Sequence, residues 1–314
     1  MIYYLVADGC ERYNTFSPYY NFVKDKEVLE ATGRCKVFSI PEDGYEKMRE
    51  LVGDNKPLAI VCDPVSYAHF KGFPGIKLLV TNDTHRFTAA DRDAFEAAID
   101  WATLVLSSYC LSPTLIQEYY YPRNLEAKEV FFPHHVSCEP FNTQQSFDNR
   151  SDQMFVGGSL DERVYPMRSF AAKLRNAHRP ELRLDRETFM TVMGQFKYAF
   201  TCGAWAHYTV AKYFEIMKVG AILIAETPAY DLERSLLGLS SGYNCHLIKY
   251  AVELLELPPL SPEIALHGND LVMRRHTTLN RTRQVELLVE DLYHSRVVGD
   301  QTMSSYLKAQ LEVQ

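Results

Sequence analysis

The sequence predicts an α/β protein with two parallel sheets, each covered by helices, followed by a helical tail. Short apolar runs alternate with segments of helical periodicity through the first half, and the alternation resumes after a polar break. Strands separated by helices of this kind are typical of β–α–β units, whose strands run parallel. With 314 residues, the chain is long enough for two domains that each have a core.

Six apolar runs in the first half predict strands, and helical patterns lie between them. The expected strands are 2–7, 36–40, 58–62, 77–80, 104–106 and 129–132. The expected helices are 16–31, 44–52, 66–71, 88–100 and 112–121. Turn residues end several runs, among them Gly9 and Pro64, and Pro113 opens the last helix.

The second half repeats this organisation after a polar segment without either period. Strands are expected at 154–156, 198–202, 221–225 and 245–248, and helices at 165–176, 187–195, 209–218 and from 261 onward. The predicted domains are a Rossmann-like domain at 1–135, a linker at 136–153, a second Rossmann-like domain at 154–260, and a helical tail at 261–314 that packs back on them. Ligands are expected in a cleft between the two domains, because parallel sheets bind at the carboxyl ends of their strands.

Composition excludes several classes of protein. The net charge of −7, with both signs mixed along the chain, argues against a nucleic-acid partner. Seven dispersed cysteines without a C-x-x-C pair indicate reduced thiols in a cytoplasmic protein. No apolar run reaches the roughly 18 residues that a membrane-spanning helix needs.

The most informative stretch is the strand–loop–helix–strand pattern at 198–227. Lys212 and Glu215 are three residues apart on the expected helix, so they share one face near its start. A helix start and a lysine suit a phosphate, and a glutamate can accept hydrogen bonds from a pair of hydroxyls. Together they indicate a nucleotide. The alternative is an ordinary solvated pair, which is the more common role of this spacing.

A second candidate segment follows the first strand of the second half. Gly157 and Gly158 can bring backbone amides close to a phosphate, and Ser159, Arg163 and Arg168 follow. A plain turn is the alternative. Neither a G-x-G-x-x-G fingerprint nor a phosphate-loop lysine is present.

These segments resemble one family. The helix K-Y-F-E-I-M-K-V-G-A-I-L-I-A is similar to the donor-binding helix of GT-B glycosyltransferases, commonly R/K-x-F-E-A-M-A-x-G-x-P-V-I, especially the group-1-like and spore-maturation-type enzymes. F-V-G-G-S followed by Y-P-M-R resembles their F-x-G-S and Y-P-x-R pieces. V-F-F-P-H-H-V-S-C-E-P-F resembles their interdomain crossover.

The resemblance implies transfer of a sugar from a nucleoside diphosphate, with UDP favoured and GDP possible, to a hydroxyl of a glycan or other acceptor. It places Glu215 at the ribose hydroxyls and Lys212 at the diphosphate. The expected donor-binding residues are Gly157, Gly158, Ser159, Arg163, Arg168, His207, Tyr208, Thr209, Lys212 and Glu215. Cations and helix starts stabilise the leaving diphosphate, so no metal and no cofactor beyond the nucleotide sugar are expected.

The catalytic base is expected in the first half. Asp83 and His85 follow an expected strand, and either can act as a base or bind a sugar. Equally, Asp83 can cap the next helix. Retaining relatives carry a glutamate where this chain has His207, which favours an inverting reaction with Asp83 as base. The acceptor is expected near Asp8 and Gly9.

Other interpretations remain open. A sugar-nucleotide 2-epimerase would use the same fold and the same donor, and a non-catalytic nucleotide-binding protein would need only the donor site. A metal site at His134 and His135 is not expected, because neighbours on an extended chain point in opposite directions and no third ligand accompanies them.

Overall fold

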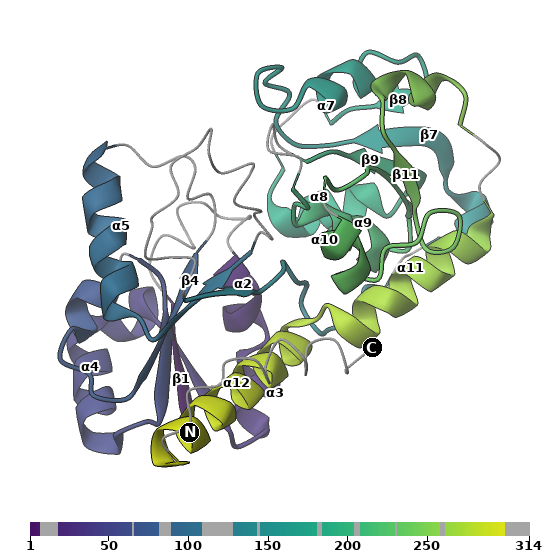
Figure 1. Ribbon diagram of the computed structural model, residues 1–314. Helices are drawn as coiled ribbons and strands as arrows, with labels where there is room; N and C mark the ends of the chain where they lie inside the picture. The colour runs from purple at the N-terminus through teal and green to yellow at the C-terminus, as the bar shows by residue number, and fades with distance from the viewer. Residues whose placement is uncertain are drawn as a thin grey trace. The chain divides into compact units, whose positions relative to one another are not determined.

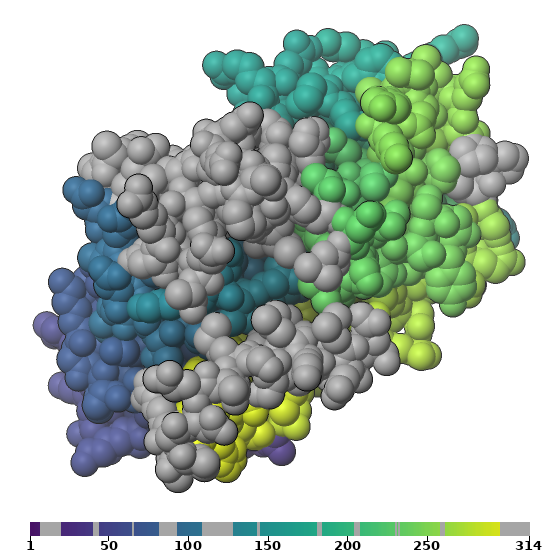
Figure 2. Space-filling view, viewed as in Figure 1, coloured from purple at the N-terminus to yellow at the C-terminus, as the bar shows by residue number. Residues whose placement is uncertain are grey.

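The described residues of the computed structural model form two compact units. The structure describes residues 1–6, 18–64, 66–81, 89–108, 128–142, 145–180, 184–203, 208–229, 231–257 and 261–298. The first unit holds strands β1–β6 and helix α12, and the second holds β7–β11 and helix α11 (Figure 1). The chain leaves the first unit after Pro133 and re-enters it after Thr277. In Figure 2 the first unit is purple to blue with α12 in yellow, and the second is teal to light green.

The first unit contains a parallel six-stranded sheet in the order β2-β1-β3-β4-β5-β6. Its strands are β1 (Ile2–Val6), β2 (Cys35–Ser39), β3 (Ala59–Cys62), β4 (Ile76–Thr81), β5 (Leu104–Ser107) and β6 (Glu129–Phe131). Ile2 pairs with Cys35 on one side and with Ala59 on the other. Parallel strands joined by helices confirm the predicted α/β class.

Both faces of this sheet are buried. Successive side chains of a strand point to opposite faces, so each strand contributes to two separate cores. Tyr4 and Val6 belong to a core that receives residues of α2 (Pro18–Lys24), α3 (Lys26–Ala31) and α12 (Thr278–Val298). Tyr3 and Leu5 belong to another core, formed with α4 (Ile40–Asn55), the 3₁₀ helix η1 (Ser66–Phe70) and α5 (Ala89–Trp101). The continuous apolar run of β1 is therefore that of a strand covered on both faces.

Helix α12 is part of the first unit although it comes last in the described chain. Val285, Leu288 and Val289 are buried in the core that contains Tyr4. The buried Arg281 side chain donates from Nε to the carbonyl oxygen of Pro133 at 2.9 Å.

The second unit contains a parallel five-stranded sheet in the order β11-β10-β9-β7-β8. Its strands are β7 (Ser151–Val156), β8 (Ala177–His178), β9 (Phe196–Thr201), β10 (Ile222–Glu226) and β11 (His246–Ile248). Val156 pairs with Phe200, and Thr201 pairs with Ala225. The carboxyl ends of β7, β9 and β10 are therefore level with one another at one edge of the sheet.

Helices cover this sheet as well. Helix α7 (Pro166–Ala171) and the 3₁₀ helix η4 (Ala251–Leu255) contribute to the core around Met154, Val156 and Phe200. Helices α8 (Arg186–Met193) and α9 (Lys212–Lys218) pack against β9 and each other. α10 (Asp231–Leu236) follows β10, and α11 (Pro262–Arg275) packs on α9 and β10.

Several element boundaries differ from the sequence prediction. The helix expected at 209–218 begins at Lys212, and on the loop before it the Thr209 amide donates to the carboxylate of Glu233. The helix expected at 165–176 ends at Ala171, and the short strand β8 follows it. Strand β7 begins at Ser151, inside the segment predicted as a linker; its first residues are polar and partly exposed, which hides the strand pattern.

Candidate functional site

In the second sheet, the strands that follow β7 in sequence lie first on one side of it and then on the other. From β7 the chain goes to β8 on one side, then crosses to β9 on the other. Ligands of such sheets bind outside the carboxyl ends of the strands at this switch point. The loops that leave β7 and β9 begin at Gly157 and Cys202. All described donor-binding candidates lie on these two loops or on the helices that follow them.

Two glycines bring the loop after β7 close to side chains of other elements. A β-carbon on Gly157 would lie 2.5 Å from the Phe189 ring. A β-carbon on Gly158 would lie 2.9 Å from Cε of Lys212 and 3.2 Å from Nη1 of Arg168. Gly158 also has a φ of 103°, which favours glycine. The Gly158 backbone thus lies against two cationic side chains.

Arg168 ties the two loops together. Its side chain is buried, and it donates from Nη1 to the carbonyl of Ser159 and from Nη2 to Thr201 Oγ1 and the carbonyl of Cys202, each at 3.2 Å. The guanidinium carbon lies 4.0 Å from the centre of the Tyr165 ring. These contacts fix a positive charge at the switch point and order both loops around it.

Lys212 is the first residue of α9 and lies beside the same glycine. Its Nζ is 5.5 Å from the centre of the Phe189 ring. Burial lowers the pKa of Lys212 to about 8; Glu215 opposes this shift, and Arg168 and Arg186 add to it. An anion placed here would raise this pKa again and favour the charged form of the lysine.

Glu215 is buried one turn further along α9, with 1% of its surface exposed. Its Oε1 lies 3.0 Å from Nη2 of Arg186, in an ion pair whose two side chains are both nearly inaccessible. Among the described residues, its Oε2 has no hydrogen-bond partner. Buried carboxylate oxygens are rarely left without donors, so this one is available to a ligand.

Arg186 was not among the residues singled out from the sequence. It is the first residue of α8, a position at which an arginine is usually solvated, and no local pattern distinguishes it. Only packing of α8 against α9 brings it to Glu215. Arg168, Arg186 and Lys212 with Glu215 leave a surplus of two positive charges when Lys212 is protonated. This group is suited to an anion that also carries hydroxyls.

Tyr208 and Thr209, predicted to bind the donor, are buried on the loop before α9. The Thr209 amide donates to Oε1 of Glu233 at 3.0 Å, and Glu233 is fully buried on α10. Burial raises the pKa of Glu233, and the hydrogen bonds from Thr209 oppose the shift. Glu233, a second residue that sequence reasoning missed, therefore fixes the loop that leads to Lys212.

Arg163 lies apart from the cationic group in the second unit. Its side chain is 90% exposed and makes two contacts with Asp161, Nε to Oδ1 at 3.1 Å and Nη2 to Oδ2 at 3.0 Å. The remaining predicted site residues lie outside the described part of the chain: Asp8, Gly9, Asp83, His85 and His207. Among the residues that the structure describes, no three His, Cys, Asp or Glu side chains are grouped as a metal site requires.

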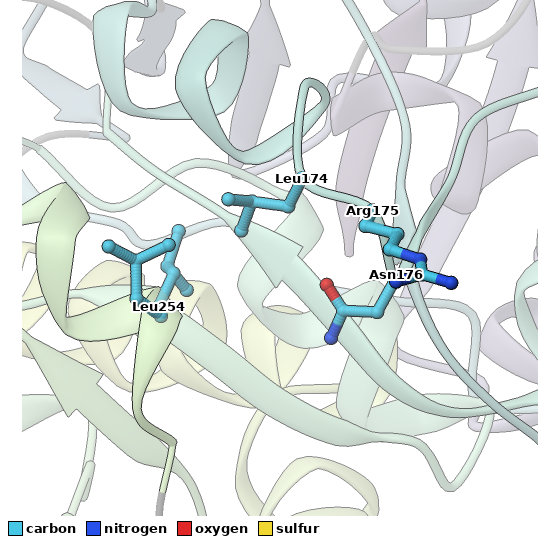
Figure 3. A pocket seen from close by; sticks show the side chains of 5 residues that line it. Leu174, Arg175, Asn176 and Leu254 are labelled. Atoms are coloured by element: carbon cyan, nitrogen blue, oxygen red, sulfur yellow. The ribbon is translucent and has the colours of Figure 1, made fainter.

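A separate cavity of about 410 Å³ lies in the second unit, lined by Leu174, Arg175, Asn176, Leu254 and Leu255. Figure 3 shows the Leu174 and Leu254 side chains together with the polar ends of Arg175 and Asn176 beside them. Residues 174–176 come directly before β8, at the amino end of that strand. Because β8 is parallel to β7, this cavity lies at the opposite edge of the sheet from Gly158.

Comparison with known proteins identifies the fold. No protein-family model matches the chain, and no curated protein matches it in sequence. Among solved structures, HepE of Anabaena in complex with UDP and glucose matches with 10% identity and a TM-score of 0.56, over 93% of this chain and 100% of that one. A glycosyltransferase of Rickettsia africae matches with 10% identity and a TM-score of 0.58, over 93% and 98%.

An alpha-glucosyltransferase in complex with UDP-glucose and DNA containing an abasic site also matches, with 8% identity and a TM-score of 0.59, over 92% of this chain and 99% of that one. At such identities the likeness establishes the fold. The chain has the GT-B fold of glycosyltransferases, as its sequence resemblance predicts. Within its described residues, no helix combines the length and apolar character needed to cross a membrane.

Proposed function

We propose that this protein is a glycosyltransferase that moves a sugar from a nucleoside diphosphate, with UDP favoured over GDP, to a hydroxyl of an acceptor. One observation carries the proposal: a buried carboxylate, Glu215, lies among three cations at the switch point of the second sheet. The fold supports it, since the matching HepE structure contains UDP and glucose, and the matching alpha-glucosyltransferase contains UDP-glucose.

The diphosphate and the ribose of the donor would bind to different residues of this site. The diphosphate would lie against Gly158 and Lys212, where the backbone is exposed and Arg168 and Arg186 add positive charge beside the lysine. The ribose would place its two hydroxyls at the free Oε2 of Glu215. Each hydrogen bond to a charged group contributes roughly 1.5–3 kcal/mol, so three at the upper end of this range reach the roughly 8 kcal/mol of micromolar binding.

Transfer would break the bond between the anomeric carbon and the diphosphate oxygen while an acceptor oxygen bonds to that carbon. Negative charge then develops on the leaving diphosphate, and the cations of Lys212 and Arg168 stabilise it without reorganisation. We therefore propose that no divalent metal is needed. Inversion is favoured, with Asp83 taking the acceptor proton, His85 beside it, and Asp8 and Gly9 on the acceptor side.

The acceptor is proposed to be a glycan or another hydroxyl compound. One matching structure contains DNA, but that contact belongs to the other protein. The net charge of −7 here opposes nucleic acid, because phosphate contacts require a concentrated basic surface.

Binding of UDP and GDP tests the donor site directly. UDP at one hundred times its dissociation constant should stabilise the protein by about 2.7 kcal/mol, seen as a rise in melting temperature. Lys212→Ala and Glu215→Gln should each remove most of this effect. Lys173→Ala is the matched control, because it removes a lysine from an exposed ion pair with Glu162. Equal UDP binding by Lys212→Ala and the control would contradict the site.

Product analysis tests the reaction. A transferase releases free nucleoside diphosphate in proportion to glycosylated acceptor and continues in EDTA, whereas an epimerase interconverts nucleotide sugars without releasing it. Asp83→Asn should keep UDP affinity while lowering turnover by about a hundredfold to ten-thousandfold. Donor binding without either reaction would leave only a nucleotide-binding role.

A further inference from the structure

We propose that Arg186 is a positioning residue for nucleoside recognition: its ion pair holds the Glu215 carboxylate turned so that Oε2 meets the ribose diol. This inference rests on the proposed function and deepens it. It assigns a role to a side chain that the sequence pattern does not distinguish.

The two helices face each other through matched pairs of residues. On α8, Arg186 and Phe189 are three residues apart and share a face; on α9, Lys212 and Glu215 have the same spacing. Arg186 pairs with Glu215 at 3.0 Å, and the Phe189 ring lies 5.5 Å from the Lys212 ammonium. The arginine therefore serves the ribose end of the site, and the aromatic ring serves the diphosphate end.

The start of α8 is fixed, which makes Arg186 a rigid support. The Asp185 side chain caps the helix, with Oδ1 accepting the Thr188 amide at 2.9 Å and Oδ2 accepting the Thr188 hydroxyl at 2.6 Å. Packing of Phe189 against Gly157 and Phe155 holds the next turn.

Burial explains why Glu215 needs this partner. A carboxylate out of water costs free energy unless a cation or a hydrogen-bond donor lies beside it. One carboxylate oxygen has lone pairs for two hydrogen bonds, so Oε2 alone can accept both hydroxyls of the diol. Because Arg186 contacts Oε1, the second oxygen is left for the ligand. Without the arginine, Oε1 would lose its ion-pair partner, the carboxylate would rotate away, and the diol would lose its acceptor.

The test compares three ligands: UDP, 2′,3′-dideoxy-UDP and inorganic pyrophosphate, measured by calorimetry on the whole protein. Wild type should prefer UDP over the dideoxy form by roughly tenfold or more, the value of one charged hydrogen bond. In Arg186→Leu this preference should fall to about one, while pyrophosphate affinity changes by less than the UDP affinity does. Arg186→Lys should recover part of the preference. Arg175→Leu, an exposed arginine at the opposite edge of the sheet, should behave like wild type.

The combined variant Arg186→Leu/Glu215→Gln guards against a folding defect, because it removes both members of the buried ion pair together. Its UDP preference should equal that of Glu215→Gln alone, since the arginine acts only through the glutamate. Additive losses, or equal losses of UDP and pyrophosphate affinity in Arg186→Leu, would make Arg186 a direct diphosphate ligand and overturn the positioning role. An unchanged preference in Arg186→Leu would overturn it as well. Wild-type protein that binds no UDP would instead overturn the proposed function, and this inference with it.

Discussion

Raising the pH from 7 to 9.5 should weaken UDP binding, because Lys212 loses its proton within this window. Its pKa is lowered to about 8 in the free protein by burial and by its arginine neighbours. A bound diphosphate should return the pKa toward the ordinary value near 10, so the complex keeps the proton. At pH 9.5 about one free molecule in thirty is still protonated, and the affinity should fall about thirtyfold.

Calorimetry in two buffers of different ionisation heat checks this expectation, because binding near pH 9 should take up close to one proton per molecule of UDP. The last ionisation of the UDP phosphates lies near pH 6, below this window, whereas the uracil N3–H begins to ionise at its upper end. Lys212→Met is the control, because it keeps the uracil ionisation and lacks the lysine, and its residual affinity should fall far less than that of wild type. A flat profile for wild type, or the same slope in Lys212→Met, would refute the assignment of this proton to Lys212.

Without ligand, the lowered pKa of Lys212 predicts that stability rises with pH, whereas UDP affinity falls. The folded protein binds this proton more weakly than the unfolded chain, so between about pH 8 and pH 10.5 stability rises with pH. Below pH 8, keeping Lys212 charged in its buried position lowers the free energy of unfolding by about 3 kcal/mol. Lys212→Met should therefore unfold at a higher temperature than wild type at pH 7, with a gain of up to about 3 kcal/mol, while losing UDP. A lower melting temperature would show that the lysine is well compensated without a ligand.

Three further perturbations follow from the contacts. Gly158→Ala places a β-carbon on a residue with positive φ and against Lys212, so about 1–3 kcal/mol of stability should be lost and UDP binding should weaken. Urea unfolding and calorimetry measure the two effects. Unchanged values would contradict the close approach of Gly158 to Lys212. Glu233→Ala leaves the buried Thr209 amide without its acceptor, and about 1–3 kcal/mol of stability should be lost, with Glu233→Gln recovering most of it. Leu288→Ala should destabilise the first unit by about 2–5 kcal/mol without changing UDP affinity in the folded protein; an equal loss with exposed Tyr293→Ala would contradict the core role of Leu288.

Periodicity predicts the strands of the first sheet well, and the reason is physical. Strands such as β1 and β4 are buried on both faces, so their apolar runs are continuous and stand out from the helices between them. β8 has two half-buried residues and β7 begins with polar ones, so neither carries a clear signal at those positions. Sheet edges and strand starts are partly solvated, and there the pattern is lost.

Some residues of the candidate site could be predicted from the sequence, and others could not. Lys212, Glu215 and the glycines lie close together in sequence within two segments, and their spacing and resemblance were enough to single them out. Arg186 and Glu233 reach the site from other helices by packing alone, and nothing near them in the sequence indicates it. The roles of Asp83 and His85 stay predictions, because both lie outside the described residues.

The late position of α12 has a consequence for synthesis of the chain. Val285, Leu288 and Val289 complete a core that also contains residues of Ile2–Val6, so the two parts of that core leave the ribosome with the second unit between them. The second unit, which needs no residue after Thr277, is complete before that helix emerges. Until then the nascent chain carries an uncovered apolar surface on the strands of the first unit, the kind of surface that chaperones bind.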